Sequence, residues 1–189
     1  SAPFSLGRRG FVVSEGAGCI VLASRAFARA HGLAFETELA GWAMTADAYH
    51  AVMPNRAQVA RCIADSLRHA GLSPAAIDAV NAHAASTRIG DRVEADALKE
   101  VFGDQIPPVS ANKSQLGHAM GATSAVESIL AIEGLRRGVL LPTINHLPDP
   151  AIALDCVAEG ARPLDQSVVL KNAFGFGGCN ACLVFRRVT

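Results

Sequence analysis

The feature that most restricts the fold is an alternation of short apolar runs with longer segments of helical periodicity. Runs rich in apolar and β-branched residues predict strands at Glu36–Thr45, Ile77–His83, Pro108–Ala111, Ala153–Val157, Ser167–Ala173 and Cys179–Val188. Apolar residues that recur every three or four positions predict helices at Asn55–Ala70, Asp91–Phe102 and Ala122–Arg136. Strand–helix alternation followed by a strand pair predicts a mixed sheet covered by helices, which is an α/β domain.

The beginning of the chain is predicted to add two strands and a short helix. Gly10–Glu15 and Ala17–Ser24 are the strands, and Arg25–His31 is a helix that ends at Gly32, a natural left-handed cap. The candidate core residues of the two strands are Val12, Val13, Cys19, Ile20, Val21 and Leu22.

Composition excludes several classes of function. Half of the 189 residues are hydrophobic, 18% are charged, and the net charge is zero, so neither nucleic acid nor an anionic membrane is expected as the main partner. No apolar run reaches the roughly 18 residues that a membrane span requires, and the first ten residues lack the apolar core of a signal peptide. The surplus of apolar side chains indicates a surface that packs against another protein segment.

The five cysteines are scattered and odd in number. Cys179 and Cys182 form a CNAC sequence that resembles half of a redox or zinc site, but no second pair exists to complete a metal site. In a strand, two residues three positions apart also point to opposite faces. Packed thiols explain the pattern better than ligands do. We therefore expect no metal and a location in the reducing cytoplasm.

Three motifs carry the candidate chemistry: NAHAAST at Asn81–Thr87, SANKSQLGH at Ser110–His118 and NAFGFGGCN at Asn172–Asn180. In them His83, Lys113 and the loop Gly175–Gly178 each follow a predicted strand. Ligands of α/β sheets bind outside the carboxyl ends of the strands, so these groups are expected to lie together. Each histidine taken alone is more often structural than catalytic. His118 differs because Lys113 lies five residues before it and glycines flank it.

Three acids each have a structural and a functional interpretation. Asp91 and Glu94 lie in the first turn of a predicted helix, where acids favour the helix dipole, and Asp91 could cap that helix. Alternatively, one of the two holds Lys113 in a buried ion pair. Glu127 lies in the most apolar helix, where an unpaired charge is costly. It is therefore expected to be paired, hydrogen-bonded, or on an exposed edge.

Gly175, Gly177 and Gly178 surround Phe176 and are not typical of a strand interior. They indicate a loop with accessible backbone N–H groups and a mobile ring. Such a loop suits an oxyanion hole. It resembles a phosphate loop only weakly, because no lysine and serine follow it.

Together the motifs resemble the C-terminal part of a β-ketoacyl-acyl-carrier-protein synthase, a thiolase-fold condensing enzyme. Gly10–Ser24 (GFVVSEGAGCIVLAS) resembles the strand pair that ends the first half of these enzymes. The resemblance divides the chain into residues 1–40, a remnant of the N-terminal thiolase-like half, and residues 41–189, the C-terminal half. It implies a homodimer or a heterodimer of synthase subunits that acts in fatty acid or polyketide synthesis.

The resemblance also implies roles for single residues. His83 and His118 match the two catalytic histidines, and Lys113 matches the active-site lysine that Asp91 and Glu94 organise. Glu127 matches a further acid of the family. The Phe176 N–H would help to form the oxyanion hole and its ring would gate the acyl pocket. Thr87, Gly175, Gly177 and Gly178 match substrate-binding positions. No cofactor is implied, because the substrates are carried on the phosphopantetheine of an acyl carrier protein.

None of the five cysteines matches the nucleophile of the family, so we expect a cysteine-bearing N-terminal half as partner and no activity from this chain alone. Ala85 replaces a threonine that helps to hold the pantetheine arm. An alternative function is that of a non-catalytic subunit resembling a chain length factor, although such a subunit has no need of His83, Lys113 and His118. A self-contained Cys–His hydrolase is a third interpretation.

Overall fold

The computed structural model describes residues 1–158 and 160–188. A five-stranded sheet has the order β1-β7-β6-β2-β3. Its strands are β1 (Thr37–Ala46), β2 (Ala79–Asn81), β3 (Val109–Ser110), β6 (Val168–Gly175) and β7 (Cys179–Arg187). β1, β7 and β6 pair antiparallel, whereas β6, β2 and β3 pair parallel. The predicted mixed sheet is thus confirmed.

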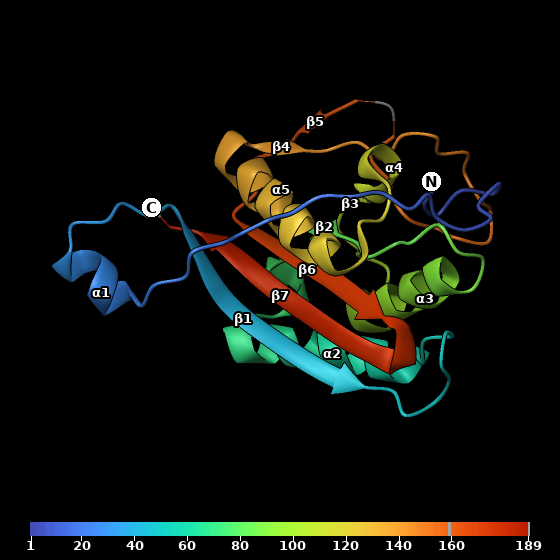
Figure 1. Cartoon of the computed structure of the whole chain (residues 1–189), viewed down its shortest axis with the longest axis horizontal. Helices are drawn as coiled ribbons and strands as arrows, with labels where there is room; N and C mark the ends of the chain where they lie inside the picture. The colour runs from blue at the N-terminus through green and yellow to red at the C-terminus, as the bar shows by residue number, and fades with distance from the viewer. Residues whose placement is uncertain (159, 189) are drawn as a thin grey trace.

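Helices cover both faces of this sheet (Figure 1). α2 (Arg56–Ala70) and α3 (Gly90–Phe102) pack on one face, and α5 (Thr123–Arg137) packs on β6 and β7 from the other. The shorter elements are α1 (Arg25–Ala30), η1 (Pro74–Ala76), α4 (Lys113–Leu116), η2 (Met120–Ala122), β4 (Val139–Leu140), β5 (Arg162–Pro163) and η3 (Phe176–Gly178). Among the described residues, no helix has the length and apolar character that crossing a membrane requires.

The sequence sets the limits of α2 in the predicted way. Asn55 caps its first turn by accepting hydrogen bonds from the N–H groups of Ala57 and Gln58 at 3.0 and 3.3 Å. Gly71 ends it with a left-handed φ of 67°. α2 and α3 then bury their apolar sides against the sheet around Ile63, and each such aliphatic side chain contributes about 1.5–3 kcal/mol.

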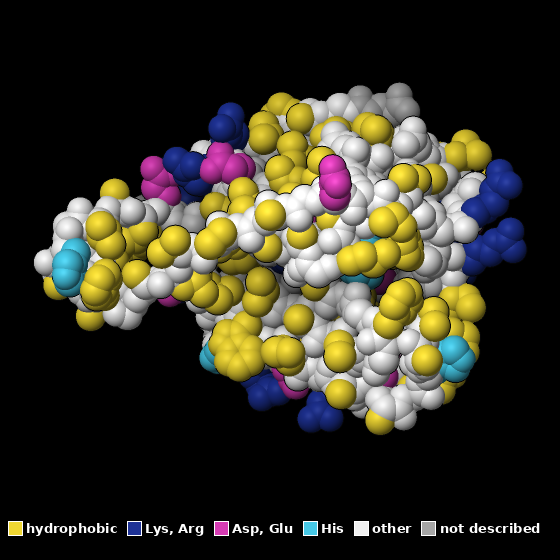
Figure 2. Space-filling view, in the orientation of Figure 1, with side chains coloured by type: hydrophobic (Ala, Val, Ile, Leu, Met, Phe, Trp, Pro, Cys, Tyr) yellow, Lys and Arg dark blue, Asp and Glu magenta, His cyan; other side chains and the backbone are white. Residues whose placement is uncertain are grey.

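The two strands predicted at Gly10–Glu15 and Ala17–Ser24 are wrong. These residues form an extended arm that crosses in front of α5 and the sheet and leads to α1 (Figure 1). Among the residues that the structure describes, the arm has one strand-like pairing, a bridge between Val13 and His118. Most of its predicted core residues lie on the surface: Val13 is 66% exposed and Val21 is 89% exposed. Figure 2 shows these apolar side chains along the arm.

Other predicted elements differ less. The strand at Ala153–Val157 is wrong, because only Cys156 pairs there, through an isolated bridge to Val109. The strand Ile77–His83 is confirmed over the shorter range of β2. α5 is buried along one side only, so its apolar remainder stays partly exposed. The proposed division at residue 40 stays a prediction; β1, the first strand of the sheet, begins at Thr37.

Candidate active site

The three motifs meet at one edge of the sheet. His83 follows β2, Lys113 follows β3, and Gly175 ends β6. Because these three strands are parallel to one another, their carboxyl ends lie at the same edge. A cavity of about 600 Å³ opens there. Its lining includes both histidines, Thr87, Phe176, Cys179 and Met120. The predicted meeting of the motifs is therefore confirmed.

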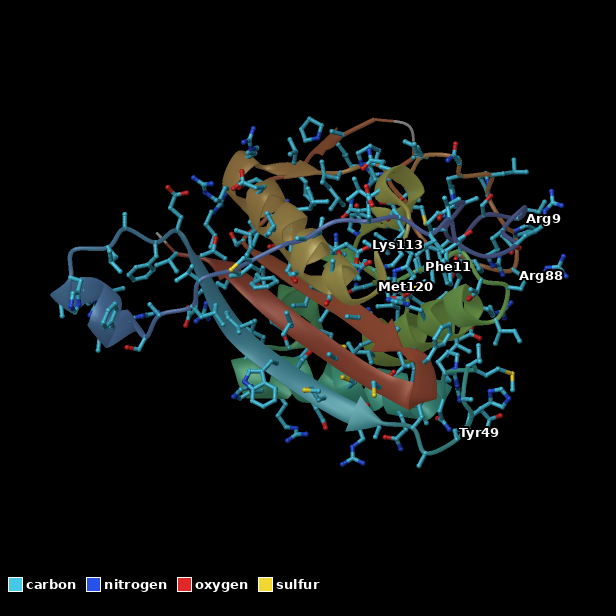
Figure 3. The ribbon with its side chains drawn as sticks, in the orientation of Figure 1. Arg9, Phe11, Tyr49, Arg88, Lys113 and Met120 are labelled. Atoms are coloured by element: carbon cyan, nitrogen blue, oxygen red, sulfur yellow. The ribbon has the colours of Figure 1, made fainter. Side chains whose placement is uncertain are left out.

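The two histidine rings lie edge to face, and both line this cavity. Their centroids lie 5.7 Å apart with the planes inclined at 79°. Phe174 flanks His83 at 5.5 Å, and Phe11 of the arm contacts His118 edge-on at 4.8 Å. Figure 3 shows Phe11, Met120 and Lys113 close together at this place. Aromatic walls and adjacent polar rings suit a reacting group that needs both apolar surroundings and hydrogen-bond donors.

His118 is held in one tautomer. The Met120 N–H donates to its Nδ1 at 3.2 Å, and the Thr123 hydroxyl lies 2.9 Å from the same atom. A ring nitrogen that accepts an N–H carries no proton, so the neutral ring bears its proton on Nε2. Burial, followed by the nearby charges of Lys113 and Lys171, lowers the pKa of His118. His118 is therefore a neutral ring that can donate a hydrogen bond from Nε2.

The pKa of His83 is also lowered, well below its usual value. Burial is the first cause, and the charges of Lys113 and Lys171 add to it. The backbone of His83 is fixed on both sides, because its N–H donates to Glu94 Oε1 at 2.9 Å and its carbonyl accepts from Lys113 Nζ. His83 therefore has a fixed backbone and a ring whose lowered pKa favours the neutral form.

Glu127 is paired, as one of the three sequence interpretations expected. Its carboxylate lies between two buried lysines: Lys113 Nζ is 2.8 Å from Oε1 and Lys171 Nζ is 2.8 Å from Oε2. Burial alone would raise the pKa of Glu127, but the two lysines hold it below its usual value. Burial lowers the pKa of Lys113, which the charge of Glu127 partly offsets.

The predicted ion pair between Lys113 and Asp91 or Glu94 is wrong. Glu94 instead accepts from the N–H groups of His83 and Ala84 at 2.9 and 2.7 Å. Asp91 accepts from the N–H groups of Phe4 and Thr87 at 2.8 and 3.0 Å. Burial raises the pKa of both acids, that of Asp91 to about 7. The two acids therefore shape the loop after β2, while the lysine takes its partner from α5.

The glycine-rich segment forms the predicted loop. Gly177 and Gly178 have φ values of 77° and 80°, and a Cβ on Gly178 would lie 2.4 Å from the Asp47 Cβ, so both conformation and contact require glycine. The Gly177 N–H donates to the Ala51 carbonyl at 2.8 Å. The Phe176 ring is 65% exposed and lines the cavity.

Lys171 and Asn172 are residues of the site to which the sequence interpretation gave no role, although Asn172 begins the third motif. Asn172 donates to Glu94 Oε1 at 3.0 Å. A signal existed for Lys171: it is a single charge within an apolar strand, as Glu127 is a single charge within an apolar helix. Two opposite charges, each isolated in a buried element, predict a pair. Thr123 and Phe11 contact His118, but no pattern in the sequence predicts these contacts.

The two cysteines of the CNAC sequence differ in their exposure to solvent. Cys179 is exposed and Cys182 is buried, so the two point to opposite faces of β7 as predicted. Within residues 1–158 and 160–188, no group of three or more histidine, cysteine, aspartate or glutamate side chains is arranged to hold a metal ion.

Comparisons with known proteins agree with this geometry. Residues 37–146 match the family described as Beta-ketoacyl synthase, C-terminal domain. The chain is 39% identical over 193 residues to 3-oxoacyl-[acyl-carrier-protein] synthase 2 of Coxiella burnetii, with 100% of this chain and 47% of that protein covered. It thus spans about half the length of the curated relatives it matches.

Solved structures show the same likeness. The ishigamide ketosynthase/chain length factor superposes with a TM-score of 0.96 at 38% identity, over 99% of this chain and 47% of that chain. A type II polyketide synthase ketosynthase, solved with its acyl-carrier protein and bound to the hexaketide, superposes with a TM-score of 0.95 at 35% identity, over 100% of this chain and 47% of its own. These likenesses confirm the predicted α/β fold as half of a thiolase-like architecture.

Proposed function

The chain belongs to the β-ketoacyl synthase family through its C-terminal domain, and we propose that it supplies the histidine and lysine half of a condensing active site. The observation that carries the proposal is the pair of neutral histidine rings, 5.7 Å apart, at the wall of a cavity. The nucleophilic cysteine belongs, in this proposal, to an accompanying N-terminal half.

In the first step, the bond between the α carbon and the carboxylate of a malonyl thioester breaks. Its electron pair moves into an enolate, and carbon dioxide leaves. His118 Nε2–H and the His83 ring stabilise the charge that develops on the thioester oxygen, because fixed donors in a water-poor site need no reorganisation. Lys113 acts on this oxygen indirectly, by fixing the His83 carbonyl.

In the second step, the enolate carbon attacks the carbonyl of an acyl group held on the cysteine of the accompanying half. A carbon–carbon bond forms, the carbon–sulfur bond breaks, and the thiolate leaves. The Phe176 N–H is the proposed donor to the oxyanion of this step, because the Gly177 N–H is already bonded to Ala51. The exposed Phe176 ring gates the acyl part of the cavity.

The proposed substrates arrive on the pantetheine of an acyl carrier protein. Thr87 lines the cavity, and Arg88 lines both this cavity and a neighbouring surface hollow that also contains Arg9. Figure 3 shows Arg9 and Arg88 projecting from the same end of the molecule. Two exposed guanidinium groups beside a substrate channel suit an acidic carrier. The proposed setting is cytoplasmic, in a homodimer or a heterodimer.

The assay that tests this function uses the full-length protein that carries both halves, with labelled malonyl-carrier and an acyl donor. A 3-oxoacyl product two carbons longer than the donor, detected by mass spectrometry, is the expected result. Absence of both the product and the acylated cysteine would favour the alternative of a non-catalytic subunit. The retained histidines and the Lys113–Glu127 pair support the catalytic function over that alternative.

A further inference from the structure

Lys171 is a buried cation that the proposed chemistry above does not use. Its side chain is 1% exposed, and it leaves β6 on the face that α5 covers. Its neighbour Asn172 leaves the opposite face and reaches Glu94 on α3, because successive strand residues alternate. Two consecutive residues of one strand therefore connect the site to both helical layers.

Lys171 is the second cation on the buried carboxylate of Glu127. Three buried acids, Asp91, Glu94 and Glu127, and two buried lysines, Lys113 and Lys171, lie beneath the cavity. Burial raises the pKa of Asp91 and Glu94, which bind backbone N–H groups, whereas the two lysines hold the pKa of Glu127 below its usual value despite its burial. With Lys113 as its single partner, Oε2 of the Glu127 carboxylate would face no cation.

We propose that Lys171 is a positioning residue of the site, which holds the Glu127 oxygen that Lys113 does not hold and adds a second positive charge beside the two histidines. This inference rests on the proposed function. Lys171 touches no reacting atom, and its effect reaches the reaction through Glu127 and through the field at the imidazole rings. An additional positive charge beside the two rings favours the anionic transition state.

The same charge acts on the imidazole rings. The titratable and charged groups around them are Lys113 from α4, Glu127 from α5, Lys171 from β6, Glu94 and Asp91 from α3, and the other histidine. After burial, the lysines are the causes that lower the pKa of both rings, while Glu127 raises that of His118. Removal of the Lys171 charge must therefore raise both histidine pKa values.

The test compares Lys171→Met with Lys99→Met in the full-length protein. Methionine keeps the apolar stem and removes the charge, and Lys99 is an exposed lysine of α3 that pairs with Asp104. Histidines labelled with ¹⁵N are titrated by NMR, with His83 and His118 assigned from His→Gln variants. We expect Lys171→Met to raise both pKa values by about one unit, a tenfold change in proton affinity. Lys99→Met should leave them unchanged.

Decarboxylation of malonyl-carrier by Lys171→Met should fall about tenfold at neutral pH, and the acid side of its pH profile should move upward with the histidine pKa values. Unshifted histidines in a folded Lys171→Met protein would overturn the inference. If that variant does not fold, the same titration is carried out on Glu127→Gln. Because the Glu127 charge raises the pKa of His118, this variant should lower it, and an unchanged pKa would overturn the inference. A wild-type protein without decarboxylation contradicts the proposed function instead, and the titration still measures Lys171.

Discussion

Within the loop after β2, two residues other than glycine adopt the left-handed region: Ala84 at φ 32° and Ser86 at φ 64°. Such conformations cost of order 1–3 kcal/mol each and persist where neighbouring groups fix them. Here Glu94 binds the N–H groups of His83 and Ala84, and Asp91 binds that of Thr87. The sequence identifies Asp91 and Glu94 as candidate site residues. It does not reveal their role, because helical acids can bind a cation or a backbone equally well.

Ala85 provides a prediction at the same scale. It lines the cavity two residues from Thr87, and in the family resemblance it replaces a threonine that contacts the pantetheine arm. Ala85→Thr should restore one hydrogen bond, worth about 1 kcal/mol, and lower the KM for a pantetheine thioester about fivefold. Steady-state kinetics of the full-length protein measure this change, with Ala64→Thr on the exposed side of α2 as control. An unchanged KM would show that Ala85 does not face the arm.

Among the elements, α2, α3 and the β6–β7 pair were predictable, because each buries its apolar side within this chain. The arm was not. Its alternating apolar residues predict strands, but the arm crosses the structure outside the sheet and leaves Val21 89% exposed. A periodic pattern of apolar residues predicts that these residues are buried, but it does not identify the surface that covers them. The Lys113–Glu127 pair could not be predicted either, because α4 and α5 approach each other only in the folded chain.

The arm and the His118 loop form one unit. The His118 N–H donates to the Val12 carbonyl at 2.8 Å, and the Ser14 N–H donates to the His118 carbonyl at 3.1 Å. Gly117 permits this approach: its φ is 70°, and an added Cβ would lie 2.8 Å from the Val12 oxygen. The backbone of the second histidine is therefore positioned by residues about a hundred positions earlier in the chain.

Gly117→Ala should displace the arm and destabilise the fold by about 1–3 kcal/mol through backbone strain. Decarboxylation should fall with it, because His118 loses its backbone partners. Gly16→Ala is the matched control: Gly16 lies in the same arm, has no positive φ, and an added Cβ there meets nothing within 4 Å. Urea denaturation and hydrogen exchange at His118 measure the two variants. Equal stability of both would contradict the role assigned to the arm.

For the molecule as a whole, the parallel strands bring the three motifs to one edge, and this arrangement followed from the sequence. The exposed apolar surface near that edge could not be predicted from the sequence. β1 exposes Trp42 and Met44, which are 51% and 71% exposed, on a face of the sheet that α5 leaves partly open. Figure 2 shows this apolar surface beside the arm. We expect the cysteine-bearing half to cover it.

The mouth of the cavity supplies a prediction for the carrier. Arg8 forms an ion pair with Asp149, with 2.6 Å between Nη1 and Oδ2. Arg9 and Arg88 line the same hollow and are exposed. The double change Arg9→Glu and Arg88→Glu should raise the KM for acyl carrier about tenfold, and less at high salt. A short pantetheine thioester should be turned over as before. Arg61→Glu on α2 is the control; an equal loss for both substrates would contradict a docking role.

In the proposed function, this chain supplies the groups that stabilise the enolate. Release of labelled carbon dioxide from malonyl-carrier, measured in the full-length protein, tests it most directly. His118→Ala removes the Nε2 donor and should lower the rate about a hundredfold or more. His69→Ala, at an exposed histidine of α2, should leave the rate unchanged. Carbon dioxide release at the wild-type rate in His118→Ala would contradict the account.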